Sequence, residues 1–316
     1  MKKIAFVFPV YNEEGNLEIL HKEVKLACEK AQVTYEMIFV NNGSCDNSLE
    51  IIKKFKHSDS HVGYVNLSRN FGHQGALCAG LTKVRADAVI TMDADLEHPP
   101  SLIPEMIQLW QEGYDVVYTT KENHHLPFFK YKLTQFYYWL LSKLSGFTFH
   151  FGQSDFRLID NKVLQALLLM PEYHKFLRAQ ITWLGFRQKG LSYHIGQRIT
   201  GLSKFSFKNL FSFGLDGIFG FSHYPLRLIS LTGFILAGFS LLYMLKEILI
   251  PFFLKITNID PNIELPPGWL TLAGAVFFMG SFQLIALGII GEYIARIFDQ
   301  TKNRPNFVIK DMDLSQ

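Results

Sequence analysis

The first part of the chain alternates short apolar runs with amphipathic stretches. The apolar runs are residues 4–10, 35–40, 62–67 and 88–92, and the stretches between them with helical spacing are residues 16–31, 48–55 and 75–84. Strands that alternate with helices of this length predict βαβ units and a largely parallel sheet. Because the crossovers of such units are right-handed, the carboxyl ends of the strands should lie along one edge, where ligands bind.

The pattern changes at about Lys121. Residues 128–144 are aromatic-rich with helical spacing, residues 163–170 and 176–184 favour helices, and residues 191–195 favour a strand. Residues 205–224 then mix Phe, Leu, Lys and Gly in an amphipathic pattern. This pattern predicts a juxtamembrane helix that lies on the bilayer surface, and the alternative is an ordinary helix packed on the preceding domain.

Two long apolar runs follow. Residues 228–245 carry no charge, and Gln283 is the only strongly polar side chain in residues 269–291. About 20 such residues span the bilayer core as a helix. The runs therefore predict transmembrane helices at about 228–249 and 269–291, and the alternative is a pair of buried core helices.

Basic residues are unevenly distributed around these runs. The connector has Lys246 and Lys255, opposed by Asp260 and Glu264, whereas the outer flanks carry Arg227, Arg296, Lys302, Arg304 and Lys310. The positive-inside rule then places both termini and the first domain in the cytosol. We expect four parts, namely a catalytic domain at 1–204, a juxtamembrane segment at 205–226, two spans within 227–296 and a cytosolic tail at 297–316.

Composition supports a membrane enzyme more than a nucleic-acid-binding protein. Hydrophobic residues make up 48% of the 316 residues, and the net charge is only +3. A general nucleic-acid partner is not expected at this charge. The three cysteines, Cys28, Cys45 and Cys78, lack metal-ligand spacing and are typical of reduced cytosolic thiols.

The strongest chemical signal is Asp93-Ala94-Asp95, which ends the apolar run 88–92. A spacing of two places both carboxylates on one side of an extended chain, just past the sheet edge. Carboxylates there are suitable oxygen ligands for Mg²⁺ or Mn²⁺, with substrate phosphates completing the shell. The sequence has no Gly-x-Gly-x-x-Gly or Walker-type loop, so we expect metal and basic side chains to hold those phosphates.

Four motifs in order resemble the inverting family-two glycosyltransferases, which have the Rossmann-like GT-A fold. They are Phe8-Pro9-Val10-Tyr11-Asn12-Glu13-Glu14, Asn41-Asn42-Gly43-Ser44-Cys45-Asp46-Asn47-Ser48, Asp93-Ala94-Asp95 and Asp155-Phe156-Arg157-Leu158. The two C-terminal runs and Gly291-Glu292-Tyr293-Ile294-Ala295-Arg296-Ile297 are similar to the polyprenyl-phosphate branch. Bactoprenol glucosyl transferases and dolichyl-phosphate mannose synthases belong to that branch.

The resemblance implies a role for each matching position. The nucleotide-sugar site would include Pro9, Tyr11, Glu13, Asn42, Asp93 and Ala94. Asp95, with Glu97 beside it, would ligate the metal, and Asp155 would lie near the acceptor as the candidate base. Arg198, Ser203 and Lys204 would approach the acceptor and diphosphate. We expect Asp155 to act mainly by positioning, because a phosphate monoester with a second pKa near 6 is already a charged nucleophile.

Two of these positions depart from the family pattern. The family commonly has Asp where this chain has Asn42, and often has Gln where this chain has Glu97. The amide keeps an acceptor oxygen but removes a charge. The added carboxylate could tighten metal binding or hinder release of the anionic product. The histidines His73, His98 and His194 are isolated in the sequence and predict no ligand set.

The resemblance implies transfer of a single hexose, glucose being favoured, from a UDP-sugar to undecaprenyl phosphate. The alternatives are a GDP-mannose-dependent mannose synthase, a nucleotide-sugar-binding membrane scaffold without activity, and a processive synthase. The last is disfavoured because Gln180-Ile181-Thr182-Trp183 lacks the arginine of the processive motif.

The expected setting is the bacterial inner (plasma) membrane, with membrane lipids as partners and the product used to modify lipopolysaccharide, O-antigen or another cell-envelope glycan. Small residues in the two runs, such as Gly233, Gly238, Gly274 and Gly280, permit close helix packing. We therefore expect a homo-oligomer, with a tetramer as one candidate state.

Overall fold

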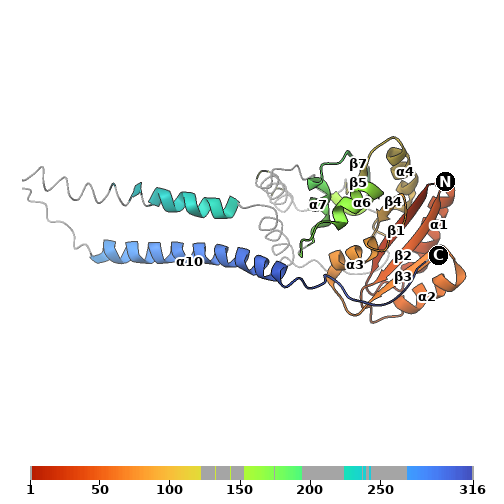
Figure 1. Ribbon diagram of the computed structural model, residues 1–316, viewed down its shortest axis with the longest axis horizontal. Helices are drawn as coiled ribbons and strands as arrows, with labels where there is room; N and C mark the ends of the chain where they lie inside the picture. The colour runs from red at the N-terminus through yellow and green to blue at the C-terminus, as the bar shows by residue number, and fades with distance from the viewer. Residues whose placement is uncertain are drawn as a thin grey trace, which may run out of the picture. The chain divides into compact units, whose positions relative to one another are not determined.

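A computed structural model describes residues 2–121, 132, 143, 153–173, 175–193, 224–236, 238–239, 242 and 269–314 (Figure 1). The chain divides into two compact units. The first comprises Met1–Gly214 and Asn303–Gln316, and the second is Leu215–Lys302.

The first unit is built on an eight-stranded sheet with the order β7-β5-β6-β4-β1-β2-β3-β8. Its strands are β1 Lys3–Val10, β2 Thr34–Asn41, β3 Val62–Leu67, β4 Ala88–Thr91, β5 Val116–Lys121, β6 Gln153–Asp160, β7 Gln188–Tyr193 and β8 Ile309–Asp313. Its helices are α1 Leu17–Ala31, α2 Ser48–Ser58, α3 Gly72–Leu81, η1 Pro100–Leu102, α4 Ile103–Gln111, α6 Asn161–Leu168 and α7 Leu177–Trp183.

The predicted α/β class and the largely parallel sheet are confirmed. The structure also has antiparallel strands that the sequence pattern did not indicate. The pairs β1–β2, β2–β3, β1–β4 and β5–β7 are parallel. Strand β6 runs antiparallel to both β4 and β5, and β8 runs antiparallel to β3. The strands β5, β6 and β8 and the helix α4 were not predicted.

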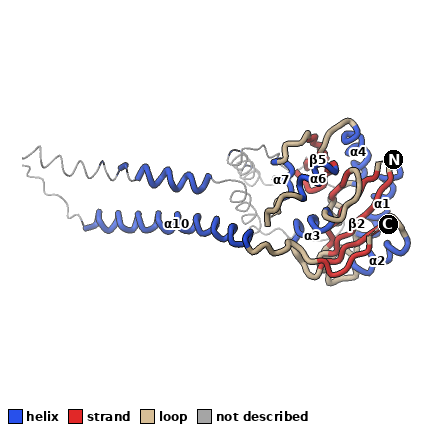
Figure 2. Tube along the Cα trace, viewed as in Figure 1, coloured by secondary structure: helices blue, strands red, loops and turns tan. Residues whose placement is uncertain are grey.

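Helices cover both faces of the sheet, because the central strands are apolar on both sides (Figure 2). On β1, Ile4, Phe6 and Phe8 pack with α1, α2 and α4, whereas Ala5 and Val7 pack with α3, α6 and α7. Continuous apolar strands of this kind are expected where a parallel sheet is buried between two helical layers. The result is a three-layer domain whose loops emerge at the ends of the strands.

Strand β8 joins the sheet after the second unit, so residues 303–316 belong to the first unit. A chain of polar contacts fixes it there. Asn41 of β2 donates to Asn66 of β3 at 2.8 Å, and Asn66 donates to Oδ2 of Asp311 at 2.7 Å. The segment 297–316, predicted as a tail, therefore holds the end of a helix and an edge strand that covers β3.

The second unit contains α10, Trp269–Thr301, and a shorter apolar helix, Tyr224–Leu236. Among the described residues, one helix, Gly274–Thr301, is long and apolar enough to cross a membrane. The apolar side chains of α10 include Leu272, Phe277 and Leu284, each more than 65% exposed.

Several predictions fall wholly or partly outside the described residues. These are the aromatic-rich helical segment at 128–144 apart from residues 132 and 143, the surface helix at 205–226, most of the first span, the strand end at 194–195, and the site residues Arg198, Ser203 and Lys204.

Candidate active site

The register of β4 and β6 brings two carboxylates together at the edge of the sheet. Thr91 of β4 lies opposite Arg157 of β6, and the strands are antiparallel. Two residues beyond Thr91 is Asp93, and two residues before Arg157 is Asp155, so the same register places these aspartates opposite each other. The Thr91 hydroxyl donates to the carbonyl oxygen of Asp155 at 2.6 Å and fixes this edge.

His73, in the first turn of α3, lies between these two aspartates. Its Nε2 is 2.7 Å from Oδ1 of Asp93, and its Nδ1 is 3.8 Å from Oδ2 of Asp155. Burial alone lowers the pKa of His73, but the charges of Asp93 and Asp155 outweigh it and raise the pKa to about 9. At neutral pH this imidazole is therefore a cation held between two anions.

His98 supports Asp93 from the protein interior. The backbone N–H of Asp93 donates to Nδ1 of His98 at 3.1 Å, and Nε2 of His98 lies 2.6 Å from the Ser154 hydroxyl. Because Nδ1 accepts, a neutral ring carries its proton on Nε2. Burial lowers the pKa of His98, which favours this neutral form. His98 thus connects the turn after β4 to the start of β6.

Asp95 and Glu97 lie on a tight turn after β4. Oδ1 of Asp95 accepts the backbone N–H of Glu97 at 3.1 Å, and Leu96 between them has a φ of 63°. A leucine backbone in this left-handed region costs roughly 1–2 kcal/mol, so contacts elsewhere in the fold must stabilise this conformation of Leu96. Leu96 also packs against the core, which offsets that cost.

Glu97 already has a cationic partner. Nζ of Lys121, at the end of β5, donates to Oε2 of Glu97 at 2.9 Å. Within the described part of the chain, no three His, Cys, Asp or Glu side chains converge to hold a metal ion. Asp95 and Glu97 are therefore a sparse oxygen set, which fits Mg²⁺ or Mn²⁺ only if substrate phosphates supply further ligands.

The loops after β1 and β2 interlock beside these carboxylates. The N–H groups of Asn12 and Glu13 donate to the hydroxyls of Ser44 and Ser48 at 3.1 and 3.0 Å. The Asn12 side chain accepts the N–H of Cys45 at 2.8 Å. Pro9 is the next-to-last residue of β1, Tyr11 directly after the strand is 37% exposed, and Ala94, between the two aspartates in the sequence, is buried. The predicted nucleotide-sugar residues thus follow adjacent strands.

Asn42 differs from the other predicted nucleotide-sugar residues because its side chain is buried and engaged. Its Nδ2 donates to Oδ1 of Asn70 and to the carbonyl oxygen of Gly72, and its Oδ1 accepts the N–H of Phe71. These bonds hold the loop that leads into α3 and so determine where His73 lies. The proposed contact of Asn42 with the base region stays a prediction.

Arg178, in the first turn of α7, was not predicted from the sequence. Its Nε and Nη2 donate to Oδ1 and Oδ2 of Asp155, both at 2.7 Å. His73 was also missed, because it is 20 residues from Asp93 along the chain. Two features of the sequence could have pointed to these residues. Arg178 lies near the start of the predicted apolar helix 176–184, and His73 follows the third predicted strand.

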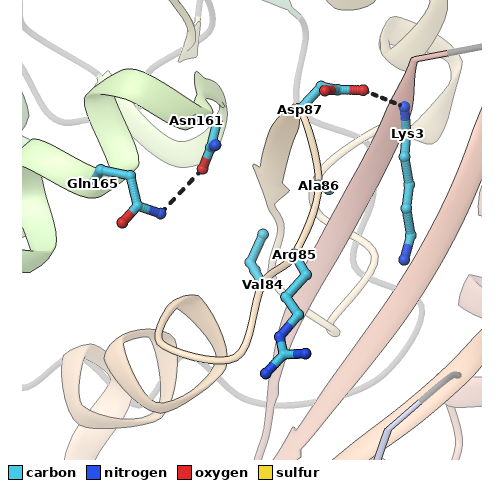
Figure 3. Close-up of a pocket in the computed structure, with 7 residues that line it drawn as sticks. All are labelled: Lys3, Val84, Arg85, Ala86, Asp87, Asn161 and Gln165. Atoms are coloured by element: carbon cyan, nitrogen blue, oxygen red, sulfur yellow. Dashed lines mark hydrogen bonds between the residues drawn. The ribbon is translucent and has the colours of Figure 1, made fainter.

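A separate hollow lies at the opposite end of the sheet. It has a volume of about 440 Å³ and is lined by Lys3, Val84, Arg85, Ala86, Asp87, Asn161 and Gln165 (Figure 3). Lys3 begins β1 and Asp87 precedes β4, so this hollow adjoins the amino ends of the strands. Asp93 follows the carboxyl end of β4, and the hollow is therefore distinct from the candidate active site.

The sequence is similar to known glycosyltransferases over nearly its whole length. The model of glycosyl transferase family 2 matches residues 5–168. The putative glycosyltransferase CsbB of Bacillus subtilis is 38% identical, over 98% of this chain and 92% of CsbB. The bactoprenol glucosyl transferase of Shigella phage SfII is 35% identical, over 98% of this chain and 97% of that protein. The prophage bactoprenol glucosyl transferase homolog of Escherichia coli is 34% identical, over 98% of both chains.

Proposed function

This chain belongs to glycosyl transferase family 2, and we propose that it transfers a single glucose from UDP-glucose to undecaprenyl phosphate. It is a glycosyltransferase with a GT-A-like α/β fold. The observation that carries the proposal is the full-length similarity to proteins named bactoprenol glucosyl transferase, at 34–35% identity. Donor, acceptor and orientation in the membrane are the parts that need experiment.

The carboxylate edge supports a transfer at a nucleotide sugar. Asp93 and Asp95 follow β4, beside the interlocked loops after β1 and β2. Ligands bind at this edge in open α/β sheets. We assign Pro9, Tyr11, Glu13 and Asn42 to the nucleotide side, and Asp93 and Ala94 to the donor.

A divalent cation, Mg²⁺ or Mn²⁺, would be held by Asp95, with Glu97 as a second oxygen donor, and it would neutralise the leaving diphosphate. Neighbouring side chains keep these carboxylates in position. His73 keeps Asp93 oriented, and His98 fixes the turn that carries Asp95. Arg198, Ser203 and Lys204 are proposed to bind the acceptor phosphate and the diphosphate.

The acceptor phosphate needs little help with proton removal, because its second pKa is near 6 and it is mostly dianionic in the cytosol. The Arg178 contact also makes Asp155 a weak base. Burial raises the pKa of Asp155, but the charge of Arg178 holds it far below its usual range. We therefore assign Asp155 a positioning role at the acceptor side.

The return of the chain to the sheet supports two spans. β7 precedes the second unit and β8 follows it, yet both strands belong to one sheet. If α10 crosses the bilayer, the chain must cross an even number of times between these strands. A span at about 228–249 would supply the second crossing, and both termini would then face the cytosol, as the flanking charges favour. Such an anchor holds the site near a lipid acceptor that cannot leave the membrane.

The test is a transfer assay on the full chain in nanodiscs, with undecaprenyl phosphate and a panel of UDP- and GDP-sugars. We expect one glucose per lipid phosphate from UDP-glucose and dependence on Mg²⁺ or Mn²⁺. Asp95→Ala should lose nearly all transfer while still inserting into membranes. Wild-type transfer by this variant would contradict the metal assignment.

Other outcomes of this assay would identify one of the alternative functions. Transfer from GDP-mannose would identify a mannose synthase, and a polymer would identify a processive synthase. Donor binding without turnover under any of these conditions would indicate a membrane scaffold. The number of subunits in the nanodisc would test the proposed homo-oligomer.

A further inference from the structure

Arg178 is held in a defined orientation at the start of α7. Its Nη1 donates to the carbonyl oxygen of Gln153 at 2.8 Å, while Nε and Nη2 bind both oxygens of Asp155. The N–H of the preceding residue, Leu177, donates to Oε1 of Gln74 at 3.2 Å. Gln74 is next to His73 on α3, so α7 and α3 are fastened together beside the site. A forked, three-point contact of this kind fixes a guanidinium more firmly than a single hydrogen bond would.

Asp155 has cations on several sides. Besides the two short bonds from Arg178, Nη2 of Arg157 lies 3.9 Å from Oδ1, and Nδ1 of His73 lies 3.8 Å from Oδ2. The Asp155 side chain is only 9% exposed. A buried carboxylate surrounded in this way stays ionised, since protonation would leave the cations without a counter-charge.

The buried Arg157 guanidinium also depends on the Asp155 carboxylate for its counter-charge. It is 2% exposed, and its Nη2 donates to the carbonyl oxygen of Ser154 at 2.8 Å. In the described part of the chain its Nε and Nη1 have no hydrogen-bond partner. Asp155 therefore supplies the nearby negative charge for a buried guanidinium as well as for Arg178.

His73 is the member of the group that is open to a ligand. Its side chain is 42% exposed, compared with 27% for Arg178 and 2% for Arg157. Asp93 is within hydrogen-bond distance of one ring nitrogen and Asp155 is within ion-pair distance of the other, so the charges of both carboxylates favour this direction of the ring. Arg178 secures one of them.

We propose that Arg178 is a positioning residue for the transfer reaction, which fixes Asp155 as a permanent anion so that Asp155 orients His73 toward the substrates. This inference rests on the proposed function for the reaction that it serves. It assigns Asp155 to hold cations in place, and it removes the need for Asp155 to accept a proton. Arg178 acts through Asp155 and His73, at the side of the site where the acceptor phosphate must approach the sugar.

The first experiment separates a positioning role from a merely structural one. We would measure thermal unfolding, kcat and both KM values for Arg178→Gln, Asp155→Asn and the double variant, in the full chain in nanodiscs. Arg178→Gln removes the closest cation of Asp155, and Asp155→Asn removes the anion of both Arg178 and buried Arg157, so each change should lower the melting temperature. The double variant should regain only the part lost through Arg178, because Arg157 stays buried without a counter-charge. Transfer by all three should stay roughly 100-fold below wild type in kcat, with donor KM little changed.

Recovery of kcat together with stability in the double variant would overturn the proposal. Arg178→Lys should recover only part of the lost activity, because an ammonium cannot bind both carboxylate oxygens in the same fork. The matched control is Arg85→Ala, at the far end of the sheet (Figure 3). Arg85 is exposed, and its removal should leave kcat and both KM values unchanged.

A second measurement does not depend on the substrate. The effects of His73→Gln and Arg178→Gln on the melting temperature should be non-additive, and they should become additive when Asp155→Asn is present in every variant. Additivity in both backgrounds would refute the proposed linkage. Failure of wild-type glucose transfer would instead refute the proposed function, and this coupling experiment would still decide the role of Arg178.

Discussion

Nε2 of His73 lies 2.7 Å from Oδ1 of Asp93, which joins the start of α3 to the end of β4. The contact makes the loop of the proposed metal site depend on a helix from another part of the chain. It also places a cation beside an aspartate that the sequence assigns to the donor. Burial raises the pKa of Asp93, but the charge and hydrogen bond of His73 outweigh it and lower the pKa to about 2.

The His73 contact should make stability depend on pH. The pKa of His73 is raised by its two carboxylate partners from 6.5 to about 9. The stabilisation is therefore complete below about pH 6.5 and is lost as the pH rises through about 9. In thermal unfolding with EDTA, wild type should exceed His73→Gln most near pH 6, and the difference should shrink toward pH 10. An unchanged difference across this range would contradict the assignment.

The Lys121–Glu97 ion pair should limit how strongly the site binds metal. Lys121→Met would free the Glu97 carboxylate, and we expect Mn²⁺ to bind several-fold more tightly, as for a gain of about 1 kcal/mol. The measurement is Mn²⁺ titration of the full chain followed by electron paramagnetic resonance, without nucleotide. The double variant Glu97→Gln with Lys121→Met should return to near wild-type affinity. Equal affinity in wild type and Lys121→Met would show that Glu97 does not reach the ion.

Gly43 should tolerate no side chain. Its φ is 71°, and a β-carbon there would lie 2.7 Å from the backbone carbon of Arg69 and 2.7 Å from the nitrogen of Asn70. Gly43→Ala should therefore cost at least about 1 kcal/mol of unfolding free energy. Because the displaced loop leads to His73, activity should fall as well. The control is Gly15→Ala, where a β-carbon meets nothing within 4 Å, and both variants can be compared by denaturant unfolding.

Asp311 should be needed as a hydrogen-bond acceptor more than as a charge. It accepts from Nδ2 of Asn66, a residue that is only 5% exposed. Asp311→Ala leaves that buried amide without its partner and should cost about 1–3 kcal/mol. Asp311→Asn keeps an acceptor oxygen and should cost much less. Hydrogen exchange of the β3 amides would report the loss directly, and equal protection in both variants would argue against this contact.

The sequence predicted the elements whose apolar period is regular. The strand at 62–67 has the predicted bounds, and the predicted strands at 4–10 and 35–40 lie within β1 and β2. Helix α1 also agrees, because Leu17, Leu20, Val24 and Ala27 recur at helical spacing and are buried. Local patterns were sufficient for these elements, because the strands are continuous apolar runs buried on both faces and α1 packs one apolar face on the core.

Long-range pairing was the part that local patterns could not supply. β6 carries the buried polar residues Asp155 and Arg157. Its sequence therefore lacks the continuous apolar run by which a central strand is predicted. β8 has the charged sequence Ile309-Lys310-Asp311-Met312-Asp313, which is typical of an exposed edge. The contacts of Asp155 with His73 and Arg178 likewise depend on the fold, because these residues come from three separate segments.

The late position of β8 in the chain sets an order for biosynthesis. β3 must wait as an open edge while α10 emerges from the ribosome, because its partner strand is translated after that helix. An unpaired edge is a site where other chains can add and aggregate. The sheet therefore stays incomplete until the apolar helix has been made, and β8 can cover this edge only after that helix.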